Sequence, residues 1–551
     1  MRRIVLTSAA LLAAAAAATV VGLADSSGVG LTGVPTANPH TPGYAPASRL
    51  SPELTQIVVA QGSTKLENPS ALVSTYGYYN DVLNAAGDPQ MIPTAASPTE
   101  AQKSEPDKNT YLVFGHGLKG ADPNYDYGSE FLFQGHELGV SGASYITRIN
   151  LDADAQHRVT LLATTDTSGN PIKPIDGSTW DPFARRLLFT TENASAPTYA
   201  ATPDYPSTVE DVSGALGRGG YEGIQNDGDG NIWIVEDIGG STKPDPAGPP
   251  TPNTTAKIPN SFIYRYVPKH PGDLHNGKLQ VLQVLNASNQ PITQASQTAL
   301  NSPDQLALHT YGSTFTTKWI TIHDTTVDGT TAFNANTLAK AKGGTPFKRP
   351  ENGLFRPGSG FREFYFDETG DTNATSPENA TAGGWTSIWK LTQSGPSADS
   401  GQLTIFYKGD QAHAGFDNVA WLSRNQVTFV EDAGDGLHDQ RQALDSGWVF
   451  DVTKDYSKPE NQPVRWLAEG RDPSATLDSG ASPAGFGKNE GDNEITGAHV
   501  SDGDPRVSGI LGAKIPNLGD GDWRWFYTQQ HGDNFTYEVV VTHHPHHGFG
   551  D

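Results

Sequence analysis

Short apolar runs alternate with tight turns along most of the chain, and one arrangement of them recurs. Residues 220–237 contain an acid, a short apolar strand, a turn near residue 229, a second apolar strand and another acid. Residues 415–432 repeat this order around a turn near residue 424. The first strand of an antiparallel hairpin starts at the edge where the second one ends. We therefore expect both acids of each hairpin at the same end of a sheet.

The remaining apolar runs extend this hairpin into a larger repeat. Related hairpins occur at residues 176–192, 351–367 and 494–531, and residues 131–137 resemble the second strand of another. Candidates for a third strand begin at residues 144, 261, 387 and 447, and candidates for a fourth begin at residues 159, 279, 403 and 464. The pattern predicts an all-β fold, a β-propeller of about six four-stranded antiparallel blades with loop insertions. An all-β sandwich is the alternative, but it does not place an acid at each matching strand end.

The two ends of the chain differ from this pattern. Arg2 and Arg3 precede an alanine-rich apolar stretch, which is typical of an export signal, with a retained membrane anchor as the alternative. We expect a signal peptide at residues 1–24, a flexible lead-in at 25–60, one propeller domain at 61–542 and a histidine-rich tail at 543–551. The protein is thus predicted to be secreted, either extracellular or periplasmic.

Composition narrows the classes of partner. The 60 glycines and 39 prolines agree with many turns and short strands. The formal charge of 37 − 61 = −24 repels nucleic acid and anionic lipid, so we expect neither as a partner after signal removal. The chain contains no cysteine, which excludes thiolate catalysis and thiolate metal sites. We expect a monomer that acts on a small molecule.

The acids at strand ends are the main candidate for chemistry. The innermost strands of a propeller surround its axis, so acids at matching strand ends would converge in one funnel. Carboxylates crowded there repel one another unless cations neutralise them, and oxygen-rich sites suit Ca²⁺, Mg²⁺ or Fe³⁺. Each acid could instead cap a turn or lie solvated on a rim. The predicted metal ligands are Glu137, Glu192, Glu222, Asp237, Glu351, Asp417 and Glu494, with Glu236 and Glu431 as further candidates for the funnel.

Two other side chains are predicted to be catalytic. Arg349 lies two residues before Glu351, and its planar fork matches the oxygens of a phosphoryl group. The alternative is a salt bridge that holds Glu351 in place. His531 ends an apolar strand and could serve as a ligand, an acid or a phosphate donor, or be purely structural.

Several short segments, taken in order, resemble the PhoX-type alkaline phosphatases. They are residues 133–137, 189–192, 221–223, 349–353, 416–418, 494–497 and 528–531. The most specific is Arg349-Pro-Glu351-Asn-Gly, which is similar to the family's Arg-Pro-Glu-Asp. The resemblance implies a secreted six-bladed propeller that hydrolyses phosphate monoesters with iron and calcium. It also implies Glu222, Glu351 and Glu494 as metal ligands and Arg349 as a phosphoryl contact.

One position departs from the family. Thr191 stands where the family has a cysteine that binds iron, so we expect calcium as the cofactor and leave iron open. The predicted function is a secreted metal-dependent phosphatase that hydrolyses phosphate esters in an axial, carboxylate-lined funnel. The alternatives are a calcium-dependent propeller hydrolase of the lactonase or phytase-like type and a non-catalytic propeller braced by calcium.

Overall fold

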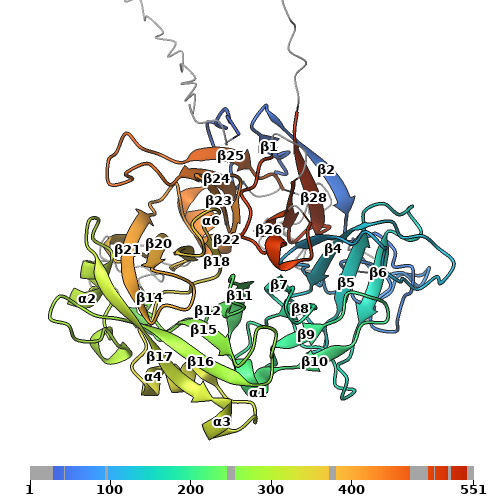
Figure 1. Ribbon diagram of the computed structural model, residues 1–551. Helices are drawn as coiled ribbons and strands as arrows, with labels where there is room; N and C mark the ends of the chain where they lie inside the picture. The colour runs from blue at the N-terminus through green and yellow to red at the C-terminus, as the bar shows by residue number, and fades with distance from the viewer. Residues whose placement is uncertain are drawn as a thin grey trace, which may run out of the picture.

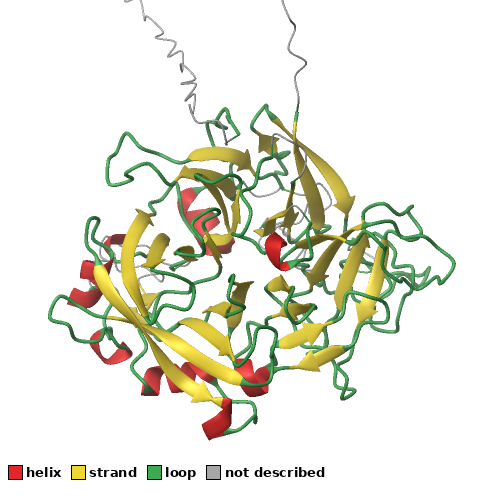
Figure 2. Ribbon diagram, in the orientation of Figure 1, coloured by secondary structure: helices red, strands yellow, loops and turns green. Residues whose placement is uncertain are grey.

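A computed structural model describes most of the chain as a ring of small β-sheets around a central axis (Figure 1). The described residues are 29–41, 44–92, 97, 99–244, 255–371, 380–471, 494–501, 503–518 and 523–542. The predicted signal peptide and histidine-rich tail lie outside these residues. Helices are short and strands dominate (Figure 2). No helix in the described part of the chain is long and apolar enough to cross a membrane.

The described strands pair into antiparallel units of four, which we call blades 1 to 6 in the following order. Blade 1 consists of β3 (Thr110–Val113), β4 (Glu130–Gly135), β5 (Ile146–Asn150) and β6 (Val159–Ala163), and blade 2 of β7 (Ser178–Asp181), β8 (Arg186–Phe189), β9 (Tyr199–Ala201) and β10 (Val209–Asp211). Blade 3 consists of β11 (Tyr221–Asn226), β12 (Ile232–Glu236), β15 (Ile263–Pro268) and β16 (Gly277–Val284), and blade 4 of β18 (Gly353–Phe355), β19 (Glu363–Glu368), β20 (Ser387–Gln393) and β21 (Ser400–Lys408). Blade 5 consists of β22 (Phe416–Trp421), β23 (Gln426–Glu431), β24 (Ser446–Asp451) and β25 (Val464–Ala468), and blade 6 of β26 (Ile495–Ser501), β27 (Arg524–Gln529), β28 (Phe535–Val541) and β2 (Leu54–Ala60).

The first strands of the blades form a closed ring around the axis. Each of β3, β7, β11, β18, β22 and β26 contacts the next, and β26 contacts β3 again. Six apolar clusters fill the spaces between neighbouring blades; one of them, for example, joins Trp233 of blade 3 to Phe364 and Trp389 of blade 4. The predicted all-β propeller is therefore confirmed.

Two strands come from the segment that was predicted to be a flexible lead-in. Strand β2 pairs with β28 and supplies the fourth strand of blade 6, while β1 (Arg49–Leu50) pairs with β25 at the edge of blade 5. The C-terminal part of the chain provides three strands of blade 6, so the N-terminal part completes that blade. This pairing closes the ring by joining the two ends of the described chain.

The remaining elements lie outside the four-stranded blades. Strand β17 (Phe315–Asp324) pairs with both β16 and β21, which links blades 3 and 4 into one sheet of nine strands. The others are β13 (Thr242–Pro244), β14 (Thr255–Lys257), α1 (Ser213–Leu216), α2 (Pro303–Leu308), α3 (Thr325–Asp328), α4 (Ala335–Ala341), α6 (Gly434–Arg441), η1 (Gln294–Ser296) and η2 (Val507–Gly509).

A buried arginine ties blade 3 to blade 4. The Nη1 of Arg265 donates to the backbone oxygens of Pro396 and Ala398, at 2.8 Å each, in the loop between β20 and β21. Its Nε and Nη2 donate to Oε1 of Gln280, at 3.0 and 2.8 Å. The guanidinium also lies 4.7 Å from the ring centroid of Trp319. Arg265 thus satisfies acceptors on two blades while its charge is held against an aromatic face.

We predict that Arg265→Met lowers the free energy of unfolding by about 3 kcal/mol, because buried carbonyls would lose charged donors. The measurement is unfolding in urea, followed by tryptophan fluorescence. Arg362→Met, at an exposed arginine, is the matched control and should change stability little. Equal midpoints for the two variants would show that Arg265 does not brace the blades.

Candidate metal centre

The alternation of side chains along the strands decides which acids reach the axis. Tyr221 pairs with Glu236 across β11 and β12, and Phe416 pairs with Glu431 across β22 and β23, so each pair shares one face. A register shift follows Tyr221 and another follows Phe416. Such a bulge places two residues opposite one and re-aims a side chain. The acid after each of these aromatic residues, Glu222 or Asp417, is therefore turned to the other side.

Glu236 and Glu431 form hydrogen bonds within the ring of blades and do not line the axial funnel. Oε2 of Glu236 accepts hydrogen bonds from the Tyr264 hydroxyl at 3.0 Å and from Asn336 at 2.9 Å. Glu431 accepts from the indole of Trp448 at 2.8 Å and from Arg441 at 2.9 Å. The expectation that both line the funnel is wrong, because each faces the inside of its blade.

The residues that follow them, Asp237 and Asp432, lie near Arg349 instead. Asp237 forms an ion pair with Arg349. Asp432 was not predicted; the pKa of its carboxyl is raised chiefly by burial, and the nearby positive charges of Arg349 and His531 oppose that rise. Asp237 and Asp432 follow Glu222 and Asp417, respectively, by 15 residues.

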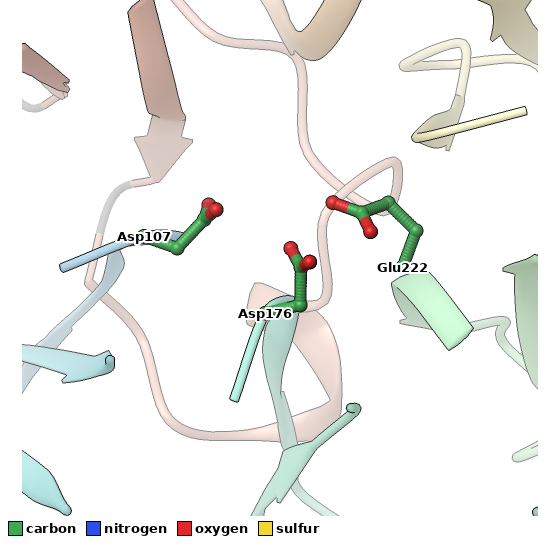
Figure 3. A group of neighbouring side chains, drawn as sticks. All are labelled: Asp107, Asp176 and Glu222. Atoms are coloured by element: carbon green, nitrogen blue, oxygen red, sulfur yellow. The ribbon is translucent and has the colours of Figure 1, made fainter. Parts of the chain in front are cut away.

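Carboxylates from all around the ring meet at the axis. In the described residues, four groups of three acids place one ligand oxygen from each member within 4.8 Å of the others. The groups are Asp107, Asp176 and Glu222; Asp107, Glu137 and Glu494; Glu137, Asp176 and Glu192; and Glu222, Glu351 and Asp417. Figure 3 shows the first group, with the Asp176 carboxylate between those of Asp107 and Glu222. Shared members join the four groups into one continuous centre.

The structure therefore brings together six of the seven predicted ligands, all except Asp237. It adds Asp107 and Asp176, which were not among the predicted ligands. Both precede the first strand of a blade, as Glu351 and Glu494 do. The signal that could have found them is this position just before β3 and β7.

Burial makes full ionisation of the centre costly. Asp107, Asp176, Glu222 and Asp417 each expose 3% of their surface or less. Burial, followed by the neighbouring carboxylates, raises the pKa of Asp176, Glu222 and Asp417 well above the usual range. Burial also raises the pKa of Asp107 to about 6. Without cations, several of these carboxyl groups would hold protons at neutral pH.

Some of these oxygens also lack hydrogen-bond partners. Oδ1 of Asp176, Oε2 of Glu222 and Oδ1 of Asp417 are buried and accept no hydrogen bond from the described residues. A buried, unpartnered carboxylate oxygen is costly, and a bound cation would satisfy it. Since the four groups offer only carboxylate oxygens, their donor set fits Ca²⁺ or Mg²⁺.

A buried lysine, Lys108, lies beside these acids. Nζ of Lys108 donates to Oδ1 of Asn418 at 2.9 Å. Asn418 in turn donates from Nδ2 to Asp417 at 2.8 Å and to Thr496 Oγ1 at 2.9 Å, and the Thr496 hydroxyl donates to Asp107 at 2.6 Å. Burial lowers the pKa of Lys108 to about 8. One protein cation thus supports the network that orients two carboxylates of the centre.

Arg349 is held by two carboxylates. Its Nη2 lies 2.8 Å from Oδ2 of Asp237 and 3.1 Å from Oε1 of Glu351, and its Nε donates to Asp237 at 2.9 Å. These contacts agree with the salt-bridge alternative. The side chain keeps 17% of its surface exposed, so it is partly accessible to solvent.

His531 lies between two acids at the mouth of the centre. Its Nδ1 is 3.6 Å from Oε1 of Glu105, and its Nε2 is 3.8 Å from Oε2 of Glu494. Glu105, Arg349 and His531 all adopt positive φ angles, of 48°, 54° and 64°. Left-handed backbone at non-glycine residues is strained and tends to occur at functional sites.

Thr191 does not replace the family cysteine as a ligand. Its hydroxyl donates to the backbone oxygen of Pro197 at 3.0 Å, and the residue is 1% exposed. Thr191 belongs to none of the four acidic groups. The residues present therefore lack the cysteine ligand of the iron site that the resemblance implies, whereas their carboxylate oxygens fit a hard cation such as Ca²⁺.

A family model and a search of solved structures relate the chain to known proteins. The model of alkaline phosphatase PhoX matches residues 253–503. The structure of Pseudomonas fluorescens PhoX in complex with vanadate, a transition state analogue, superposes with a TM-score of 0.51 at 10% identity, covering 92% of this chain and 98% of that one.

Two other solved structures have lower TM-scores. Sqt1 from Chaetomium thermophilum has a TM-score of 0.29 at 10% identity, covering 80% of this chain and 98% of its own. The WD40 domain of Toxoplasma gondii coronin has a TM-score of 0.34 at 8% identity, covering 91% and 90%. No curated protein matches the sequence. The family model and the shared fold confirm the resemblance of this chain to the PhoX-type alkaline phosphatases.

Proposed function

We propose that this protein is a secreted, calcium-dependent phosphatase that hydrolyses small phosphate esters at the axial centre. The observation that carries the proposal is the continuous set of buried carboxylates with unpartnered oxygens, such as those of Asp176, Glu222 and Asp417. The match to the PhoX family model supports phosphoryl chemistry for this set. The export signal expected at residues 1–24 supports secretion.

Substrate and centre are complementary in charge only when cations are present. Bound calcium would supply the positive charge that attracts a phosphate dianion and stabilises it as the ester bond breaks. In the hydrolysis itself, water supplies the oxygen of the new P–O bond, the bond to the leaving oxygen breaks, and a proton passes to that leaving oxygen.

The chain's own residues would orient the substrate and handle the proton. Arg349 would exchange a contact with Glu351 for a phosphoryl oxygen, since its side chain is partly accessible to solvent. His531 would hold the proton destined for the leaving oxygen, because it lies at the mouth between Glu105 and Glu494.

We expect purified protein to hydrolyse p-nitrophenyl phosphate, to lose this activity in EDTA and to regain it with calcium. Glu351→Gln should lower the activity at least about 100-fold, because it removes charge from the centre. Glu460→Gln, at an exposed acid, is the matched control and should keep full activity. A folded, calcium-loaded protein that hydrolyses no phosphate ester would overturn the proposal, and turnover of a lactone instead would support the alternative hydrolase.

The raised pKa values of the central acids predict how stability depends on pH. A carboxyl group with a higher pKa in the folded than in the unfolded state binds its proton more tightly when folded, so stability is lost as pH rises. For Asp107 this loss runs from about 4, its unfolded value, through about 6. For Glu192, whose pKa burial raises to about 8, the loss continues to that pH, so the melting temperature in EDTA should fall between about pH 4 and pH 8. Calcium should raise it more at the higher pH; an equal rise at both would contradict this account.

Arg349→Ala should weaken competitive inhibition by inorganic phosphate at least about tenfold, because a charged donor to the phosphoryl group is lost. Arg349→Lys keeps the charge without the planar fork, so its inhibition constant should fall between those of the Ala variant and the wild type. Unchanged phosphate inhibition in the Ala variant would limit Arg349 to its ion pairs with Asp237 and Glu351.

A further inference from the structure

Residues 503–518 lie between β26 and β27 of blade 6, yet they contact four other blades. Figure 1 shows η2, which belongs to this segment, as a short orange-red helix near the middle of the ring. The first strands of the six blades form a closed ring around the axis. A segment that contacts these strands on opposite sides of the ring must therefore cross the axis.

The direction of the first strands tells which end of the axis the segment crosses. Four of these strands follow directly after an acid of the centre; the acids are Asp107, Asp176, Glu351 and Glu494. The carboxylates thus lie where the first strands begin. We call the end where these strands finish the far end of the axis.

Hydrogen bonds attach the segment to the far ends of blades 1 and 2. The carbonyl oxygen of Gly503 accepts from the amide of Val113, the last residue of β3, at 2.6 Å. The carbonyl oxygen of Pro505 accepts from the indole Nε1 of Trp180 at 2.7 Å. Trp180 is the last residue but one of β7. Both donors therefore lie at the end of a first strand that is remote from the carboxylates.

The same segment reaches blades 3 and 4. The carbonyl oxygen of Leu511 accepts from Nε2 of Gln225, the last residue but one of β11, at 2.7 Å. Gly512 packs against Phe355, the last residue of β18, so closely that a β-carbon at position 512 would lie 2.9 Å from that of Phe355. Blades 1 and 4 face each other across a ring of six, so the segment spans the axis.

Internal contacts hold the segment in this position. Oδ1 of Asp504 accepts from the backbone amide of Arg506 at 2.9 Å and from its Nε at 2.8 Å. Oδ2 of Asp504 lies 3.5 Å from Nζ of Lys514, which brings the two ends of the segment together. Beneath it, Gln225 exposes only 1% of its surface although its side chain is polar.

We propose that residues 503–518 are a plug that closes the far end of the axis, so that solvent and small molecules reach the axial centre only from the end that carries the carboxylates. Hydrogen bonds to three blades and close packing on a fourth keep the plug in place. The hydrogen bonds between Lys108 and Asn418 then stay in a dry interior, where such bonds are stronger than in water.

The chain contains no cysteine, so a single introduced thiol reports the access of a reagent to its own position. We expect Gln225→Cys, beneath the plug, to react with DTNB at least about 100-fold more slowly than Ser288→Cys in an exposed turn, because a buried thiol reacts only when the structure opens. The absorbance of the released thionitrobenzoate gives the rate, and far-UV circular dichroism checks that each variant is folded.

Shortening the plug should expose this thiol. Replacing residues 506–513 by Gly-Gly-Ser should accelerate the reaction of Gln225→Cys at least about tenfold and leave that of Ser288→Cys unchanged. Trp180→Phe, which loses the hydrogen bond to Pro505, is the second variant if the shortened chain does not fold. It should accelerate the reaction of Gln225→Cys about fivefold, the factor that corresponds to one lost hydrogen bond.

Two results would overturn the plug. One is a Gln225→Cys thiol that reacts as fast as the exposed control while residues 506–513 are intact. The other is a reaction that stays equally slow in the shortened protein, or in Trp180→Phe where only that variant folds, because other residues would then close the far end. Neither calcium nor a phosphate ester enters these measurements, so their outcome does not depend on the function proposed above.

Discussion

Repulsion among the carboxylates at the axis is the constraint on which the rest of this structure depends. The fold concentrates eight acids in four overlapping groups, while the protein cations described beside them are Lys108 and Arg349. Like charges this close are tolerated only if protons or bound cations compensate them. The free energy that holds them together comes from elsewhere, from the apolar clusters between blades and from the β2–β28 pairing that closes the ring.

The sequence predicted the blades well because their information is local. A hairpin, its turn and its flanking acids lie within about 20 residues, so the repeat was visible without any long-range contact. It was harder to predict from the sequence that Glu236 faces the inside of its blade and that Asp237 contacts Arg349 instead. This difference depends on the bulge after Tyr221, which shifts the register and which composition does not reveal.

Partners that are distant in sequence were beyond prediction for a different reason. Lys108 donates a hydrogen bond to Asn418, which is 310 positions away along the chain. Asp107 likewise acquires its role only when β26 brings Thr496 and Glu494 beside it. An isolated lysine next to an aspartate is ordinary in a loop, and only ring closure turns this pair into part of a charged centre.

Arg349 lies between the acids of the centre and a neighbouring aspartate. It contacts Asp237, which follows β12, and Glu351, which belongs to the group with Glu222 and Asp417. A cation that binds Glu351 would compete with the guanidinium for the same oxygens and so would free one side of Arg349 for a phosphoryl group. Under the proposed function, loading of the centre would thus also prepare Arg349 to bind an anionic substrate, in a protein whose formal charge is −24.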